Sequence, residues 1–247
     1  MVPYTKFLLL GPQMLFFAGV FLSGCNKDEV NSCNLTSQTS DEGFQAGYTY
    51  GKSGKIERVD YKFGDGISYS ASIDYQSDKV VVSEIRSNSA EGPLELQYEL
   101  DGKGRLVSGN LGMEAEYSAE GYLSSYADLG EHVTFEYRNG NLVKSIHLTG
   151  IGVYIKNYTH HAQSYLPFSF RMNDFLANPV LQVLYEQGFM GNRQKQLVAT
   201  VSSGSDVVPR VNASFTYQIT SDGKLDHKTV ANDDGVHTTT YRYNCLD

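Results

Sequence analysis

A strand–turn–strand unit that recurs along the 247 residues constrains the fold more than any other feature of this sequence. Each unit starts at a tyrosine, passes through a glycine-containing turn and reaches a leucine or isoleucine. The unit occurs at residues 50–56, 98–106, 117–123 and 217–225. One hairpin cannot bury its apolar face alone, so such hairpins must pair with their neighbours in register. The repeat predicts a mainly β chain, an antiparallel β-meander that forms a curved sheet or half-barrel.

The clearest hairpin turns at Asn139 and Gly140. A two-residue type I′ turn needs a positive φ at both central positions, and asparagine followed by glycine meets that need. With regular pairing on both sides of the turn, Val133 would lie opposite Ile146 on one face of the sheet.

One short helical insertion is expected near residues 178–188. Asn178 can cap its first turn, Pro179 suits the first helical position, and Gly188 can end the helix. Val180 and Leu184 fall at helical spacing, which indicates one buried face.

The first 24 residues have the pattern of a signal peptide. Lys6 precedes an apolar run from Phe7 to Leu22 that Pro12 interrupts. This run is short for a membrane-spanning helix, and small residues follow it, as they do before a cleavage site. The stretch Leu22-Ser23-Gly24-Cys25 resembles the lipobox of bacterial lipoproteins. That resemblance implies removal of residues 1–24 and lipidation of Cys25; the alternative is an ordinary secretory signal.

Three charged residues follow the predicted anchor: Lys27, Asp28 and Glu29. They resemble the surface-export signal of Bacteroidetes lipoproteins. The resemblance implies an outer-membrane lipoprotein exposed on the cell surface. If these residues are only a charged tether, the protein faces the periplasm.

Residues 25–44 are polar and predict a lipidated flexible tether, and residues 45–247 are long enough for a single β-rich domain. With Cys25 lipidated, Cys33 and Cys245 remain, near the two ends of the mature chain. In an oxidising compartment we expect them to form a disulfide, which would stabilise the fold by roughly 5 kcal/mol in the chain-entropy model. The alternative is two free thiols.

The tyrosine-led turns resemble degenerate YD repeats, the RHS-type repeats found in some Bacteroidetes lipoproteins. Those proteins also tend to carry an Asn-Pro-led helical insertion before their last strands, as Asn178 and Pro179 do here. The resemblance covers most of residues 48–245. It implies a curved antiparallel sheet and no particular activity.

The sequence lacks the residue spacings of the common catalytic and metal-binding motifs. The net charge of −8 argues against a nucleic-acid partner, because phosphate backbones need a basic face. The chain has no G-x-S-x-G motif, and His160 and His161 are adjacent, so on a strand their rings would point to opposite faces. We therefore predict no metal and no cofactor.

Residues 157–175 interrupt the rhythm of the meander, and irregular loops on rigid sheets often bind ligands. The candidate ligand-binding residues are Tyr158, His160, His161, Tyr165 and Phe168. The many tyrosines have two interpretations. They are either core residues beneath the turns or an exposed platform for sugars or aromatic side chains.

Three functions fit this sequence. The first is a membrane-anchored binding or structural module for a glycan or protein ligand. The second is a glycan-acting hydrolase or lyase that uses paired carboxylates. The third is a carrier of an apolar ligand within a half-open barrel. The sequence does not indicate an oligomeric state.

Overall fold

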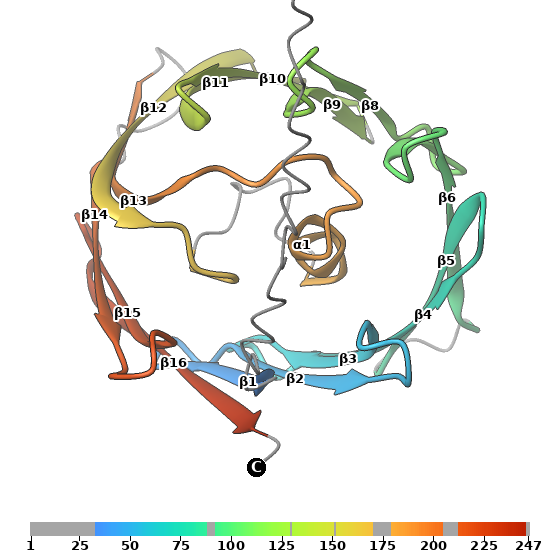
Figure 1. Cartoon of the computed structure of the whole chain (residues 1–247), viewed down its shortest axis with the longest axis horizontal. Helices are drawn as coiled ribbons and strands as arrows, with labels where there is room; N and C mark the ends of the chain where they lie inside the picture. Colours follow the sequence, from blue (N-terminus) through green and yellow to red (C-terminus); the bar gives the residue numbers. More distant parts are fainter. Residues whose placement is uncertain are drawn as a thin grey trace, which may run out of the picture.

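The computed structural model describes residues 33–87, 92–128, 130–150, 152–169, 179–204 and 212–245. Within these ranges the chain forms a single closed antiparallel β-barrel with one helix inside it (Figure 1). The elements are β1 (Cys33–Ser40), β2 (Gln45–Tyr50), β3 (Ile56–Lys62), β4 (Ser68–Tyr75), β5 (Lys79–Arg86), β6 (Leu94–Leu100), β7 (Leu106–Gly109), β8 (Glu114–Tyr117), β9 (Leu123–Asp128), β10 (Glu131–Arg138), β11 (Asn141–Thr149), β12 (Gly152–Ser164), α1 (Pro179–Glu186), β13 (Gln196–Gly204), β14 (Asn212–Ile219), β15 (Leu225–Asn232) and β16 (Gly235–Cys245).

Each strand pairs with its neighbours in sequence, as a meander requires, and the meander then closes on itself. β1 pairs antiparallel with β16, and Cys33 lies opposite Cys245 in the register. A Cys33–Cys245 disulfide joins the two strands, which confirms the predicted bond. The prediction of a curved sheet or half-barrel was therefore right about the meander and wrong about its open edges. Closure leaves no strand unpaired at an edge among the described strands. Open edges are the places where sheets tend to aggregate.

The tether predicted over residues 25–44 is also corrected, because β1 begins at Cys33. β1 is polar apart from Leu35, yet it pairs with β16 on one side and with β2 on the other. These two ladders satisfy its backbone groups, so the strand does not need a continuous apolar face. Residues 25–32 lie outside the described residues.

The hairpin at Asn139 and Gly140 forms with the predicted turn, and both residues have positive φ angles, 54° and 82°. Its register differs from the prediction. A bulge next to Tyr137 shifts the pairing by one residue, so Val133 lies opposite His147 and not opposite Ile146. An extra residue on one strand shifts every later pair by one position, and the sequence of the turn does not predict such a bulge.

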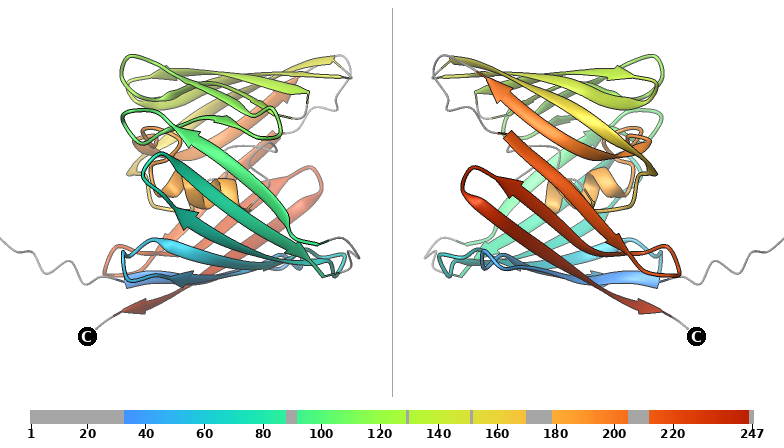
Figure 2. Two further views of the ribbon diagram at one scale, coloured as in Figure 1. Left: turned by 90° about the vertical axis from the view of Figure 1, so that its right-hand side faces the viewer. Right: turned by 90° about the vertical axis from the view of Figure 1, so that its left-hand side faces the viewer.

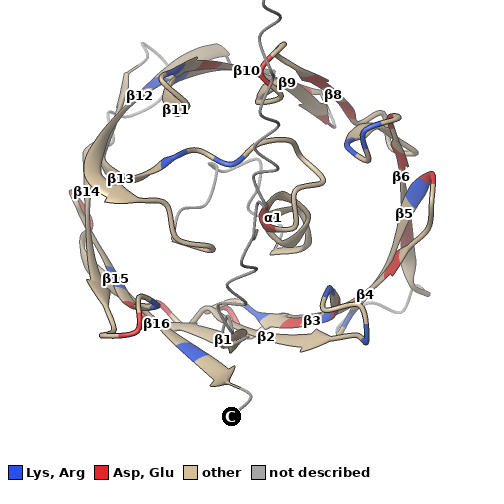
Figure 3. Cartoon of the chain, viewed as in Figure 1, with Lys and Arg blue, Asp and Glu red and all other residues tan. Residues whose placement is uncertain are grey.

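The wall of the barrel is mainly apolar on the inside and mainly polar on the outside. Along β3, Val59 and Tyr61 are buried, whereas Arg58, Asp60 and Lys62 are exposed. Exposed polar positions of this kind occur around the whole wall: Arg58, Asp60, Ser72, Asp74, Glu95, Glu99, Glu114, Glu116, Glu136, Thr200, Ser202, Thr216, Gln218 and Arg242. Figure 3 shows acidic and basic positions on strands on several sides of the barrel.

Most of the tyrosines pack into the interior of the barrel, in agreement with the core interpretation. The buried ones are Tyr48, Tyr61, Tyr98, Tyr126, Tyr158, Tyr185 and Tyr241. Those packed against the buried core are Tyr50, Tyr69, Tyr75, Tyr117, Tyr137, Tyr165, Tyr217 and Tyr243. Among the described residues, the exposed large aliphatic side chains are single or form one cross-strand pair, Leu148 opposite Val153. The sheet therefore directs its aromatic surface into the lumen.

Helix α1 lies inside the barrel (Figures 1 and 2). It begins at Pro179 and ends at Glu186, close to the predicted 178–188. All eight residues are buried, so the helix has no exposed face, contrary to the expectation of one buried face. Enclosure within the lumen explains the difference, because the wall surrounds the helix. In the described residues, no helix has the length and hydropathy needed to cross a membrane.

Candidate functional site

Residues 165–169 and 179–195, which lie between β12 and β13 in the sequence, run inside the barrel and reach one of its mouths. We call these residues the lumen segment. The mouth that it reaches is the Cys33 mouth, where β1 starts, β16 ends and the hairpin turns 101–105, 118–122 and 139–140 lie. In Figure 2, α1 is nearer to this mouth than to the opposite one.

Hydrogen bonds hold the lumen segment against the turns of the Cys33 mouth. The amide N–H of Asn192 donates to the Gly121 carbonyl at 2.8 Å, and its side-chain Nδ2 donates to the Glu120 carbonyl at 2.6 Å. The amide of Lys195 donates to the Gly140 carbonyl at 3.0 Å. The mouth is therefore made of turns and lumen segment together, and its geometry depends on both.

A pocket of about 690 Å³ lies where these parts meet. We call it the basic pocket, because Lys103, Arg105, Arg193 and Lys195 line it together with the acidic residue Glu120. Figure 3 shows basic positions in the connection from α1 to β13 and on the turn beside β6. Four cations around one pocket stand out in a chain whose net charge is −8.

A second pocket, of about 450 Å³, adjoins the basic pocket and shares Glu120, Tyr122 and Lys195 with it. The ring of Tyr122 stacks on the ring of Tyr137, with centroids 4.8 Å apart. We call this the aromatic pocket. The two pockets together offer a charged half and an aromatic half to one ligand.

Behind the mouth, a buried carboxylate fastens α1 to the rest of the lumen segment. Glu186 Oε1 accepts hydrogen bonds from the Tyr165 hydroxyl at 2.6 Å, the Phe168 amide at 2.8 Å and Gln182 Nε2 at 2.8 Å. Arg193 lies 3.6 Å from the other oxygen. Burial raises the pKa of the Glu186 carboxyl to about 7, although the hydrogen bonds and Arg193 act in the opposite direction.

The candidate residues from the sequence lie in separate places. Tyr165 and Phe168 meet at Glu186, and Phe168 has a φ of 62° and packs its ring against Tyr48 at 5.3 Å. Tyr158 is buried on β12, where its hydroxyl is 3.0 Å from Ser145 Oγ. These three residues are parts of the lumen packing and are not gathered around one pocket.

The two histidines differ in their surroundings. His161 Nε2 is 3.0 Å from the Phe215 carbonyl oxygen, and its ring meets Tyr217 edge to face. Burial lowers the pKa of His160, and a hydrogen bond with Gln194 acts in the opposite direction. Among the residues that the structure describes, no three His, Cys, Asp or Glu side chains are grouped to hold a metal ion.

Sequence reasoning missed a serine–histidine contact inside the wall. Ser145 Oγ is 2.9 Å from His147 Nε2, and the His147 ring stacks on Tyr154 at 4.3 Å. Ser145 and His147 are at most 1% exposed. Such burial keeps substrates away from Ser145 and His147. We therefore assign the pair a structural role in the packing of β11 against β12.

Sequence reasoning also missed the basic pocket. Its signal was present in the Asp-Gly-Lys-Gly-Arg turn, which supplies Lys103 and Arg105. That turn was interpreted only for its shape. Arg193 and Lys195 lie about 90 residues further along, and only the return of the lumen segment brings them to the turn.

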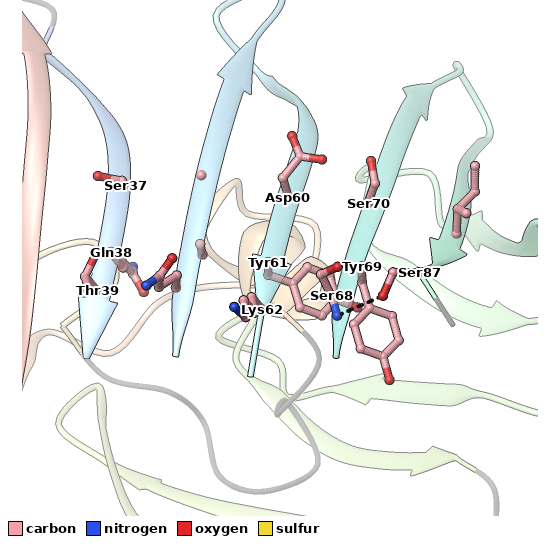
Figure 4. A pocket seen from close by; sticks show the side chains of 14 residues that line it. Ser37, Gln38, Thr39, Asp60, Tyr61, Lys62, Ser68, Tyr69, Ser70 and Ser87 are labelled. Atoms are coloured by element: carbon pink, nitrogen blue, oxygen red, sulfur yellow. Dashed lines mark hydrogen bonds between the residues drawn. The ribbon is translucent and has the colours of Figure 1, made fainter. Parts of the chain in front are cut away.

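The outer wall carries a shallow groove of about 570 Å³ across β1 to β5 (Figure 4). Ser37, Gly47, Asp60 and Ser70 are successive cross-strand neighbours there. Because the side chains at these positions are short, the surface of the wall is hollowed there. Asp60 is already paired with Arg58 at 2.8 Å, and Lys62 is the other charged residue that lines the groove.

A smaller pocket of about 350 Å³ lies at the Cys33 mouth beside the disulfide. Leu35, Tyr50, Phe168 and Tyr243 contribute apolar surface to it. The apolar-carrier hypothesis requires an empty lumen, whereas α1 occupies the lumen here. The hydrolase hypothesis requires two acids in a cleft, and each of the four pockets described above has at most one.

The predicted lipidation residue, Cys25, and the predicted export residues, Lys27, Asp28 and Glu29, lie outside the described residues. They remain predictions from the sequence.

Comparison with known proteins gives a fold and no family. No family model matches the chain, and no curated protein matches it. A porin-like protein from Bacteroides uniformis ATCC 8492 is similar in structure, with a TM-score of 0.61 and 13% identity over 85% of this chain and 98% of the other. A porin-like protein from Bacteroides vulgatus ATCC 8482 has a TM-score of 0.58 and 13% identity over 86% and 99%. At this identity the likeness shows the fold alone.

Proposed function

We propose that this protein is a lipid-anchored binding module whose barrel stands in water beside the outer membrane and offers its Cys33 mouth to a ligand. The observation that carries the proposal is the polarity of the wall. A barrel that crosses a membrane turns an apolar band toward the lipid and has a polar interior. Here Arg58, Asp60 and Glu116 face outward, and Val59 and Tyr126 face inward.

The lengths of the strands support the same view. A membrane-crossing strand has about 9–11 residues. β7 and β8 have four residues each, and β2 and β9 have six. Strands of this length would leave part of the wall too short for the hydrocarbon layer.

The filled lumen argues against transport through the barrel. Leu184 and Val183 of α1 are fully buried in the lumen, and Phe189 stacks on Tyr75 of the wall at 5.2 Å. The Phe189 carbonyl oxygen accepts a hydrogen bond from the Leu106 amide N–H at 2.8 Å. The lumen segment is therefore fixed to the wall, and the barrel acts as a scaffold that holds the residues of the Cys33 mouth in place.

The predicted anchor supports the orientation of the protein. Cys25 precedes Cys33 by eight residues, a distance of at most about 28 Å when fully extended. A lipid on Cys25 would therefore keep the Cys33 mouth close to the bilayer. The porin-like Bacteroides proteins are compatible with an envelope location.

Fractionation of cells tests whether the barrel stands in water. The mature chain with Cys25→Ser, exported behind an ordinary secretory signal, should appear in the periplasmic fraction without detergent. The wild-type chain, with its lipid, should stay with the membranes. Retention of the Cys25→Ser chain in the membrane fraction, resistant to urea, would show that the wall itself enters the bilayer.

Protease shaving of intact cells tests the face of the membrane. We expect the wild-type protein to be cleaved and a variant with alanines at Lys27, Asp28 and Glu29 to be protected. If intact cells protect both and lysed cells protect neither, the protein faces the periplasm.

A further inference from the structure

Of the four cations that line the basic pocket, two arginines are already paired and two lysines are not. Arg105 is engaged by Asp101 at 2.6 Å, and Arg193 lies 3.6 Å from Glu186. In the described part of the chain, Lys103 and Lys195 form no salt bridge, and both are exposed. They come from different segments and line the same pocket, so an anion bound in that pocket would have two lysine side chains in its lining as charged donors.

The floor of the basic pocket is fixed before any ligand arrives. Asn192 bonds to the carbonyls of Glu120 and Gly121, and Gly191 has a φ of 82°. A Cβ on Gly191 would lie 2.5 Å from the Gly121 carbonyl oxygen, so the two turns touch backbone to backbone. A preorganised floor lowers the entropy that binding loses.

The aromatic pocket adds a second kind of contact. Tyr122 lines both pockets, and its ring stacks on that of Tyr137. Tyrosine combines an apolar ring face with a polar hydroxyl, a combination that suits the faces of sugar rings. Lys195 also lines both pockets, so a phosphate and a ring joined by one ester bond could be held together.

We propose that the basic and aromatic pockets together bind a phosphorylated saccharide, with its phosphate between Lys103 and Lys195 and its sugar ring on Tyr122. This inference deepens the proposed function, and it relies on that function only for the choice of the Cys33 mouth as the ligand site. The predicted anchor holds this mouth near the membrane surface, where phosphorylated sugars occur as lipid headgroups. The same chemistry is available in a soluble sugar phosphate, and the phosphate alone is the simplest competitor.

Calorimetric titration of the full lipidated chain in neutral detergent at about 0.1 M ionic strength tests the inference. The probes are glucose 1-phosphate, inorganic phosphate and glucose. We expect glucose 1-phosphate to bind at least about tenfold more tightly than either of the others, since only it satisfies both pockets. A Lys103→Ala/Lys195→Ala variant should lose at least about tenfold in affinity.

A matched control removes two exposed cations elsewhere, at Lys62 and Arg242 on the outer wall. This variant should retain glucose 1-phosphate affinity within about twofold, because bulk charge is screened over about 10 Å. Thermal unfolding of each variant shows whether the barrel is intact. Tyr122→Ala should lower the affinity for glucose 1-phosphate toward that for inorganic phosphate.

Three results would overturn the inference: no binding of either phosphate compound, equal loss in the control variant, or equal affinity for glucose 1-phosphate and inorganic phosphate. None of these results bears on fractionation of the Cys25→Ser chain. Failure of the ligand assignment is therefore distinguishable from failure of the proposed function.

Discussion

Replacement of Glu186 by glutamine should make the barrel less sensitive to pH. Glu186 is buried at the end of α1, and its pKa is raised from 4.5 to about 7. Folding therefore takes up a proton at this group between these two pH values. Each pKa unit corresponds to about 1.4 kcal/mol, so the contribution is of the order of 3 kcal/mol.

The sign follows from the direction of the shift. Below pH 4.5 Glu186 is protonated in the folded and the unfolded chain. As the pH rises toward 7, the unfolded chain releases the proton first, so the free energy of unfolding falls. Above pH 7 both forms are ionised and this contribution is constant. Stability from Glu186 is thus present in acid and lost as the pH passes about 7.

The Glu186→Gln variant removes the titration and keeps the shape of the side chain. Its Oε1 can accept the hydrogen bonds that Tyr165, Phe168 and Gln182 donate to Glu186. The difference in unfolding free energy, variant minus wild type, should therefore increase by about 3 kcal/mol between pH 4.5 and pH 8.

Urea unfolding of both proteins at half-unit steps of pH, without reductant, measures this difference. The contributions of the histidines and of other titrating groups that both proteins share cancel in this difference of unfolding free energies. Glu95→Gln on the outer wall is the control, because Glu95 is exposed, and its curve should run parallel to that of the wild type. Parallel curves for Glu186→Gln as well would refute the assignment of a raised pKa to Glu186.

Two further predictions concern the barrel seam and the mouth. Replacement of Cys33 and Cys245 by serine should lower the unfolding free energy by up to roughly 5 kcal/mol, because 212 residues separate the bonded cysteines; equal unfolding midpoints in urea for the two proteins would contradict it. Gly191→Ala should destabilise the chain by at least about 1 kcal/mol more than Gly188→Ala in the same assay. Both glycines have positive φ angles, but only a Cβ at Gly191 meets the Gly121 carbonyl, at 2.5 Å. Equal effects of the two alanines would show that this contact yields at little energetic cost.

The sequence by itself determined the local features of this protein. Asn139 and Gly140 specify their turn through backbone angles that few other residues tolerate. Pro179 and Gly188 bound the helix for similar reasons. The Cys33–Cys245 bond was predictable because, with Cys25 assigned to lipid, only these two cysteines remain.

Only the tertiary structure decided how those parts are combined. Closure depends on the pairing of β1 with β16, about 200 residues apart. The predicted disulfide joins these two strands, but the polar sequence of β1 does not mark it as a strand of the sheet. The bulge at Tyr137 changed the register without a signal in the turn. The basic pocket joins Lys103 to Lys195 only because the lumen segment returns to the mouth. Turns and caps are set by steric limits within a few residues, whereas strand partners and pockets depend on the energy of the whole closed sheet.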